Sequence, residues 1–239
     1  MGKVGNLPDF KIEKSHWKRG VQVGGADEVG MGAFAGPVVA AVVVFTQNTI
    51  STLQGTTLEG VAVRDSKMLS FRQRQRADIW IRQRALCFAV GVGSVYEINK
   101  KGIKKASQSA LRRAFFLANK KLTYEGQLPI NHLLLDAFFL PRTKGLPVSP
   151  ITQTAIIKGD KKSFSIAAAS IVAKVHRDGL MTTLGSRAKY KKYLWNKNKG
   201  YGTLEHIKAI GRLGATHLHR KAFVKTFLGF NGFSSSRSQ

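Results

Sequence analysis

Two neighbouring apolar runs near the start of the chain constrain its fold more than any other feature. Residues 21–26 form a short apolar run that leads into Asp27, and residues 37–45 read PVVAAVVVF, a segment dense in β-branched side chains. Both patterns predict buried strands, because branched side chains suit the covered surface of a pleated sheet. A short glycine-rich connection separates the runs, so we expect them to pair as a hairpin.

Strand and helix patterns alternate along the rest of the chain. Further strands are expected at residues 88–95, 132–135 and 152–157. Helices are expected at 10–18, 71–86, 96–101, 104–122, 163–184 and 204–213, with Ser70 and Thr203 as N-caps. The helix at 104–122 carries Ala106, Ala110, Ala114 and Leu117 on one face, and residues 47–63 are expected to form a loop. This alternation, with an early hairpin, predicts an α/β fold with a mixed sheet.

Charge limits what such a protein binds. The chain has 239 residues, with 39 Lys+Arg against 13 Asp+Glu and a formal net charge of +26. Such a charge attracts nucleic acid or an anionic membrane surface. A membrane anchor is not expected, because the longest apolar stretch, residues 33–45, is too short to span a bilayer. Adaptation of a whole proteome to its habitat is the alternative explanation of the charge.

The first residues and the single cysteine indicate where the protein works. Residues 1–20 are polar and basic without an apolar segment, so no signal peptide is expected. Cys87 lies in the apolar run ALCFAV and is expected to be a buried thiol in a reducing cytoplasm.

Four acidic residues in this basic chain lie at the ends of apolar runs. Asp27 and Glu28 follow residues 21–26, Asp136 closes the run HLLLD, and Asp160 follows IIKG. Carboxylates that converge at a sheet edge suit Mg²⁺, and two such ions can drive phosphodiester hydrolysis. Successive strand residues point to opposite faces, so we expect the strand to end or bulge at Asp27 and Glu28. Ordinary strand-end or capping acids are the alternative.

Two further segments are suited to nucleic acid. Gly30 and Gly32 flank Met31 beside the first acids, and such a turn brings backbone groups close to a sugar hydroxyl. A tight turn without a ligand is the alternative. Residues 189–203, KYKKYLWNKNKGYGT, can neutralise phosphates and stack on bases or sugars. The alternative here is a solvated lysine-rich helix whose aromatic side chains are in the core.

Taken together, the motifs resemble those of type 2 ribonuclease H, the bacterial ribonuclease HII. The matching blocks are GADEVGMGAFAGPVVAAVVV (25–44), DSKMLS (65–70), LD (135–136), KGD (158–160), SIAAASIVAKVHRD (165–178), KGYGT (199–203) and HRKAF (219–223). PDFKIEKSHW (8–17) in the lead-in is also similar, so the blocks span residues 8–225 in the family's order.

The resemblance implies a ribonuclease H-like fold, with a five-stranded mixed sheet flanked by helices and a C-terminal helical extension. It implies a basic lead-in (1–20), a catalytic domain (21–185) and a substrate-binding region (186–233), and we expect a disordered tail (234–239). The implied activity is cleavage of the RNA strand of RNA–DNA hybrids and incision 5′ to ribonucleotides in duplex DNA, as ribonucleotide excision repair requires. The ends would be 5′-phosphate and 3′-hydroxyl, the cofactor Mg²⁺ or Mn²⁺ at a two-metal site, and the enzyme a cytoplasmic monomer.

The resemblance also assigns roles to single residues. Metal binding and catalysis fall to Asp27, Glu28, Asp136 and Asp160, while Asp178 is expected to be structural. The expected substrate contacts are Gly30, Met31, Gly32, Lys67, Ser170, Lys174 and Tyr201.

The chief departure from the family is at Met31. In the family a Gly-Arg-Gly turn and the tyrosine of the KGYG block sense the 2′-hydroxyl and the next deoxynucleotide, and Met31 replaces that arginine. Methionine makes no charge-assisted contact to phosphate. We therefore expect hybrid cleavage to persist while affinity or junction preference weakens. Met68 and Asn198 are smaller departures, at positions where the family usually has lysine and histidine.

Two other functions remain open from the sequence. A different nuclease of the same fold, such as a junction resolvase, would use similar carboxylates, although the 2′-hydroxyl elements argue against it. A non-catalytic basic nucleic-acid-binding protein is the second. The four acids argue against that one, because a pure binder gains nothing from negative charge that faces phosphate.

Overall fold

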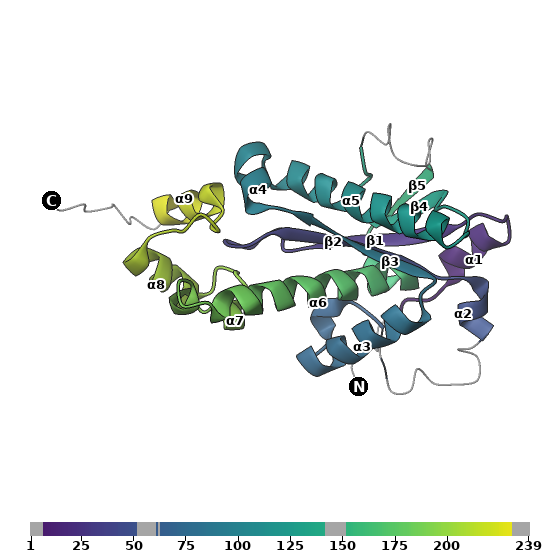
Figure 1. Cartoon of the computed structure of the whole chain (residues 1–239), viewed down its shortest axis with the longest axis horizontal. Coiled ribbons are helices and arrows are strands. Elements are labelled where there is room, and N and C mark those ends of the chain that lie inside the picture. The colour runs from purple at the N-terminus through teal and green to yellow at the C-terminus, as the bar shows by residue number, and fades with distance from the viewer. Residues whose placement is uncertain (1–6, 52–60, 62, 142–151, 231–239) are drawn as a thin grey trace.

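The computed structural model of the protein describes residues 7–51, 61, 63–141 and 152–230 (Figure 1). A five-stranded sheet has the order β3-β2-β1-β4-β5. The strands are β1 (Val23–Val29), β2 (Val38–Val44), β3 (Cys87–Gly93), β4 (His132–Asp136) and β5 (Thr152–Ile156). The β1–β2 and β2–β3 pairs are antiparallel, whereas β1–β4 and β4–β5 are parallel. The mixed sheet and the early hairpin are therefore confirmed.

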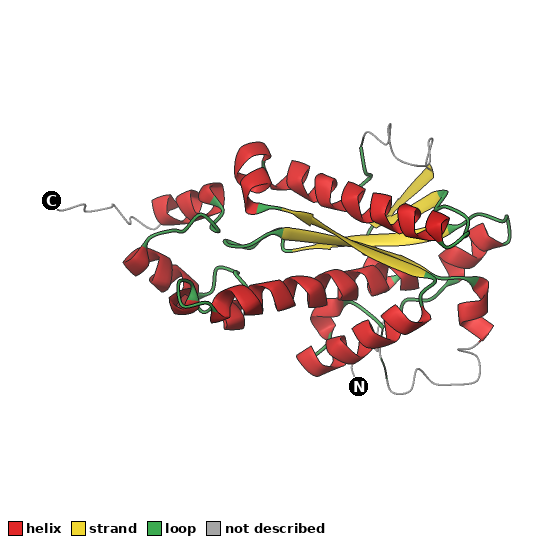
Figure 2. Cartoon of the chain, in the orientation of Figure 1, coloured by secondary structure: helices red, strands yellow, loops and turns green. Residues whose placement is uncertain are grey.

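Helices cover both faces of this sheet. One face packs against α5 (Ile103–Tyr124), and the other against α6 (Phe164–Ser186), with α3 (Phe71–Arg84) beside α6 (Figure 1). The remaining helices are α1 (Lys11–Trp17), α2 (Gln47–Ser51), α4 (Val95–Lys101), α7 (Trp195–Asn198), α8 (Leu204–Leu213) and α9 (Lys221–Phe230). Figure 2 shows the strands enclosed by helices, with α8 and α9 beyond one end of the sheet.

The central strands are sandwiched because their side chains are apolar on both faces. Alternate residues of β2 enter two separate cores, with Val42 on the α5 side and Val43 on the α6 side. Glycine allows the helices to approach closely. A Cβ atom at Gly91 would lie 2.0 Å from the carbonyl oxygen of Ala110 in α5, and one at Gly25 would lie 2.2 Å from the backbone of Ser165. The strand that carries Asp27 and Glu28 is thus fixed between two long helices.

Both expected N-caps are present. The N–H of Gln73 donates to Ser70 Oγ at 3.3 Å, and Gln73 Oε1 accepts from the N–H of Ser70 at 2.8 Å, which is a capping box. Thr203 Oγ1 accepts from the N–H of His206 at the start of α8. These local contacts fix where α3 and α8 begin.

Two details of the expected fold were wrong. Residues 47–51, expected in a loop, form the short helix α2. Leu117 is 46% exposed, although Ala106, Ala110 and Ala114 beside it in the prediction are fully buried. The buried stripe of α5 continues at Ala118 instead, because a step of four residues from Ala114 stays closer to the helix face that packs on the sheet.

Three other expectations can be compared with the described residues. Cys87 is buried, as predicted. Within the described ranges, no helix has the length and apolar character needed to cross a bilayer. Residues 234–239, expected to be disordered, lie outside the described residues.

Candidate active site

All the predicted site residues line one cavity of about 510 Å³. The four acidic residues among them are Asp27, Glu28, Asp136 and Asp160. The expected substrate contacts that share the cavity are Gly30, Met31, Gly32, Lys67, Ser170, Lys174 and Tyr201. The fold thus gathers residues from both ends of the chain at one place. Their roles remain predictions, whereas their proximity is a property of the structure.

Asp27 and Glu28 reach this cavity from opposite faces of β1. The strand neither ends nor bulges at the pair, so that expectation was wrong: Asp27 pairs with Ala41 and Glu28 with Ala40 in regular register. Asp27 faces α6, where interaction with the Ser170 hydroxyl lowers its pKa against the effect of burial, whereas Glu28 also lines a groove on the α5 side. Pairing of β1 with β4 stops at Ala26, so the part of β1 that follows Ala26 has no paired strand on the β4 side. The cavity therefore extends around this free edge.

The other two carboxylates are tied together by a turn. Asp136 is the last residue of β4, and its Oδ1 accepts from the N–H of Gly159 at 2.8 Å. Gly159 directly precedes Asp160, after Lys158 has reversed the chain in the left-handed conformation (φ 57°). This hydrogen bond holds the end of β4 against the turn after β5, so Asp136 and Asp160 face the same space.

Burial and neighbouring negative charge raise the pKa values of Asp27, Glu28 and Asp160. Burial raises the pKa of Asp27 well above its ordinary value, and the charges of Glu28 and Asp136 raise it further. The pKa of Glu28 rises to about 7, through burial and the charge of Asp136. Burial, Asp65 and Asp136 also raise the pKa of Asp160, although Lys67 and Lys161 oppose this. Such a set favours a bound proton or cation over free negative charge.

An all-oxygen donor set under this repulsion fits a hard divalent cation. Across the described residues, no three His, Cys, Asp or Glu side chains already form a group that could hold a metal ion. A bound cation would offset the mutual repulsion of these carboxylates.

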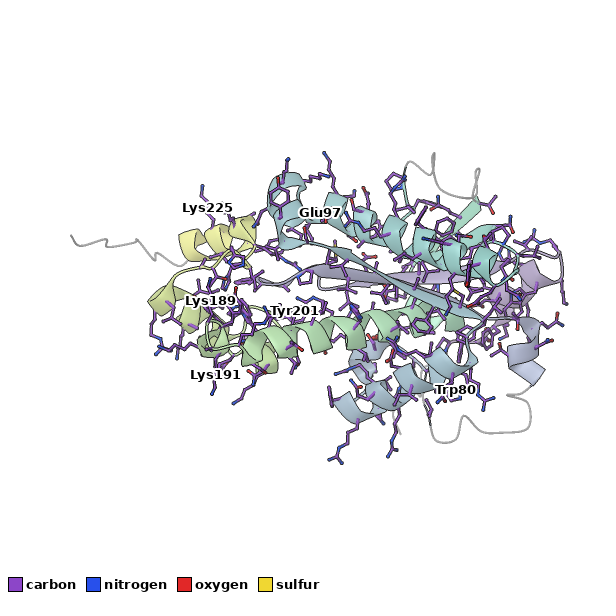
Figure 3. The ribbon with its side chains drawn as sticks, viewed as in Figure 1. Trp80, Glu97, Lys189, Lys191, Tyr201 and Lys225 are labelled. Atoms are coloured by element: carbon purple, nitrogen blue, oxygen red, sulfur yellow. The ribbon has the colours of Figure 1, made fainter. Side chains whose placement is uncertain are left out.

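Ser170, Lys174 and Tyr201 are each held by neighbouring groups. Ser170 Oγ lies 3.0 Å from Ser66 Oγ. Lys174 Nζ donates to Asp178 at 2.8 Å and lies 5.3 Å from the centre of the Tyr201 ring. Asp178 is buried and acts on Lys174, which agrees with the structural role expected for it. Figure 3 labels Tyr201 beside α6, and these contacts place its ring at the cavity with a cation against its face.

The turn after β1 is shaped by a buried arginine. Gly30 has φ +94°, and a Cβ atom there would lie 2.2 Å from Nε of Arg177. Met31 packs its side chain against the core on the α5 side. By contrast, a Cβ atom at Gly32 would meet no atom within 4 Å. The first glycine is therefore required by packing, and the second leaves open space at the cavity.

Two arginines that the sequence reasoning missed hold this turn to the C-terminal region. Arg177 and Arg220 are both fully buried. Arg177 donates to the carbonyl groups of Pro37, Ala35 and Lys199 at 2.9–3.1 Å. Arg220 donates to the carbonyls of Met31, Gly36 and Pro37 at 2.9–3.0 Å. Both lie in blocks already quoted for the resemblance, SIAAASIVAKVHRD and HRKAF, which was the available signal.

Comparison with known proteins identifies the family of this site. The sequence model of the family described as Ribonuclease HII matches residues 24–226. The chain belongs to the ribonuclease HII family. A ribonuclease HII of Thermosynechococcus vestitus is 40% identical over 218 residues, which cover 90% of this chain and 90% of that protein. One of Wolbachia pipientis subsp. Culex pipiens is 41% identical over 217 residues, covering 91% and 96%.

Solved structures share the fold. Ribonuclease H2 from Pyrococcus horikoshii superposes with a TM-score of 0.68 at 22% identity, over 90% of this chain and 100% of that one. Bst-RNase HIII in complex with Mn²⁺ has a TM-score of 0.62 at 20% identity, over 88% of this chain and 70% of that one. The expected ribonuclease H-like fold with a helical C-terminal region is therefore confirmed.

As a member of the ribonuclease HII family, the chain is a type 2 ribonuclease H, a hydrolase that cuts nucleic acid endonucleolytically. This decides against the non-catalytic binder and against a junction-specific nuclease of the same fold. The family depends on divalent metal, which agrees with the all-carboxylate set in the cavity.

In this member of the ribonuclease HII family, most of the basic-aromatic segment cannot stack on bases. Tyr190, Tyr193 and Trp195 are at most 6% exposed, and their rings stack on each other at 4.9 and 5.4 Å. They form the core of the C-terminal region, which has no strand of its own among the described residues to pack against. The stacking prediction was wrong for these three rings. Neighbouring lysines, such as Lys189 and Lys191, remain exposed (Figure 3).

Proposed function

We propose that this ribonuclease cleaves the RNA strand of RNA–DNA hybrids and incises 5′ to ribonucleotides embedded in duplex DNA. The products would carry 5′-phosphate and 3′-hydroxyl ends. One observation carries the proposal: the four carboxylates share a cavity with the turn at Gly30–Gly32 and with Tyr201. The acids would serve hydrolysis, and the turn and the Tyr201 ring would contact the sugar beside the cleaved bond.

The carboxylates of Asp27, Glu28, Asp136 and Asp160 would hold two divalent ions, either Mg²⁺ or Mn²⁺. Their oxygen donors, and the raised pKa values of Asp27, Glu28 and Asp160, support this role. When bound, such ions activate water and neutralise charge on the attacking and leaving oxygens. The chain contributes a rigid frame, because three of the donors sit on sheet strands and Asp160 lies in the short turn after β5, which is bonded to Asp136 through the N–H of Gly159.

Substrate binding would use groups around the same cavity. Lys67, Ser170 and Lys174 are suited to the phosphates and sugars of the cleaved strand. The backbone of the Gly30–Gly32 turn can read the 2′-hydroxyl without the missing arginine, since hydroxyl reading needs only the backbone geometry. Met31 would then weaken affinity or junction preference rather than cleavage itself.

The remaining parts of the proposal concern the whole chain. A catalytic domain at 21–185 would be followed by a substrate-gripping region at 186–233, whose exposed lysines, including Lys189 and Lys191, suit phosphate contact. The enzyme would act as a monomer on nucleic acid in the cytoplasm.

Cleavage of two labelled substrates tests the proposal. A hybrid duplex and a DNA duplex with one ribonucleotide are incubated with Mg²⁺ and with Mn²⁺ in turn, and a ribonucleotide-free duplex serves as the negative substrate. We expect cleavage of the first two and complete loss in Asp136→Asn. Glu125→Gln, at an exposed acid just after α5, is the matched control and should retain activity. Full activity of Asp136→Asn would remove this cavity from consideration.

A further inference from the structure

A second groove opens beside the catalytic cavity. It has a volume of about 420 Å³ and shares Glu28, Met31 and Phe138 with that cavity. We call it the flanking groove. Its other walls are Lys104, Ser107, Gln108, Leu111, Phe139 and Pro141. Because the two spaces share these three residues, the second adjoins the place where a strand would be cleaved.

One side of the flanking groove is an aromatic shelf, formed by Phe138 and Phe139. The two rings are 70% and 63% exposed, yet the backbone beneath them is fixed. The N–H of Phe138 donates to the carbonyl of Asp136 at 2.8 Å. Leu140 is buried, and the side-chain amide of Gln153 bonds both its N–H and its carbonyl, at 2.8 and 3.1 Å. Leu140 supplies the packing of this segment, so the fold does not need the two exposed rings.

The opposite side of the flanking groove comes from α5 and is mixed in chemistry. Lys104 is exposed there, Gln108 is half-buried, and Leu111 is an apolar floor. An aromatic face, an amide and a single cation match a nucleotide, whose base stacks while its phosphate seeks positive charge. Glu28 lies where the groove meets the cavity and repels phosphate, so the phosphate belongs near Lys104.

We propose that the flanking groove is a nucleotide subsite. It takes the base of a nucleotide that neighbours the cleaved position, stacked on Phe139, with an adjoining phosphate near Lys104. The partly buried side chain of Met31 is an apolar wall shared by the groove and the cavity. The inference rests on the proposed function, because it assigns part of the same bound strand.

Phe139→Ala tests the subsite, since Phe139 lines the flanking groove and not the catalytic cavity. The control is Phe116→Ala, at a ring on α5 that is 47% exposed and lines a different groove, beside β3. Kd is measured for the one-ribonucleotide duplex and for copies with a single abasic site at each position in turn. We expect Phe139→Ala to weaken binding about tenfold, and Phe116→Ala to leave it unchanged.

The abasic scan identifies the contact. At one position near the ribonucleotide, removing the base should weaken binding by the wild-type protein about as much as Phe139→Ala weakens binding of the intact duplex. Binding of that abasic duplex by Phe139→Ala should be no weaker than with either change alone, because the two changes delete the same contact. Unchanged binding by Phe139→Ala, or additive losses at every position, would overturn the subsite. Cleavage is scored separately, so failure of the proposed function and failure of the subsite are distinguishable.

Discussion

At the scale of single residues, the four cavity carboxylates lie outside the ion pairs that the described residues form. Ion pairs within the described ranges involve Asp9, Asp65, Asp78, Glu97 and Asp178. None of the four cavity carboxylates takes part in one. In a protein with 39 Lys+Arg this segregation keeps the four charges available for a cation. It also makes the metal-free site a source of instability.

Glu28→Gln should therefore stabilise the metal-free protein at alkaline pH while abolishing cleavage. The folded-state pKa of about 7 exceeds the ordinary 4.5, so the folded chain binds this proton more tightly than the unfolded chain. That stabilisation is complete below the ordinary pKa and is lost as pH rises through about 7. At pH near 8 the ionised group should destabilise the fold by about 1–3 kcal/mol.

Denaturant unfolding of wild type and Glu28→Gln in the presence of a metal chelator measures the difference in their free energy of unfolding. The variant should be more stable near pH 8, the two should converge near pH 5, and added Mg²⁺ should narrow the gap at pH 8 by stabilising wild type alone. Equal stability near pH 8 without metal would contradict a strained carboxylate cluster.

Met31 allows an equally local prediction about substrate choice. Its backbone carbonyl is fixed by Arg220, so Met31→Arg changes the side chain without releasing the turn. The new guanidinium should bind phosphate and raise kcat/KM for the one-ribonucleotide duplex relative to the hybrid, by about tenfold. Met68→Arg is the matched control, since it adds the same charge at an exposed methionine outside the cavity. An equal gain in both variants would mean that the effect is general attraction to polyanion.

At the scale of elements, the turn after β1 and the C-terminal region behave as one unit. Arg177 and Arg220 together donate to four carbonyl groups within residues 31–37, with that of Pro37 shared between them, and to the carbonyl of Lys199. Burial and the charge of Arg177 lower the pKa of Arg220 to about 9, and the carbonyl contacts offset the cost of burying both charges. The position of Tyr201 relative to Met31 thus depends on two side chains that touch neither acid pair directly.

We call the contacts of Arg177 and Arg220 with residues 31–37 the arginine clamp. Because of this clamp, Gly30→Ala should lower the free energy of unfolding more than Gly32→Ala does. The first adds a methyl group into the space of Arg177 at a positive φ, and we expect a loss of about 2–4 kcal/mol of stability with weaker substrate binding. The second meets no atom, so the fold should keep its stability. Thermal unfolding and Kd are measured for both. A decrease in affinity at Gly32→Ala with unchanged stability would indicate direct backbone contact to substrate, whereas equal unfolding of both variants would contradict the clamp.

The elements also show what the sequence could and could not predict. The hairpin, the capped helices and the convergence of four acids follow from local patterns and from parallel strands that end at one sheet edge. The expected bulge at Asp27 and Glu28 was wrong, because the free edge beside them is set by β4, about a hundred residues later. The buried arginines Arg177 and Arg220 were missed because arginine side chains ordinarily face water. Burial of Trp195 was misjudged because lysine-aromatic patterns suit both a core and a binding face.

At the scale of the whole molecule, charge and specificity are carried by different parts. The formal charge of +26 includes exposed lysines on the C-terminal region, such as Lys191 and Lys225 (Figure 3). These flexible cations attract phosphate without reading sugar or base. In the proposed function and subsite, discrimination is assigned to the cavity, the Gly30–Gly32 turn and the flanking groove. Affinity should therefore respond mainly to salt concentration, and specificity mainly to substitutions in the cavity and the turn.

Salt should weaken binding steeply and without regard to ribonucleotide content. Each phosphate contact contributes about −0.9 to the slope of log K against log salt on duplex DNA, so a slope of about −5 or steeper is expected for ribonucleotide-containing and ribonucleotide-free duplexes alike. Lys191→Gln should make the slope shallower by about 1. Lys120→Gln, at an exposed lysine in the last turns of α5, is the control and should not change it. Fluorescence anisotropy from 50 to 300 mM salt, roughly the range in which released counterions dominate, measures both. A shallow slope, or an equal change in the two variants, would show that the charge is not organised around the substrate.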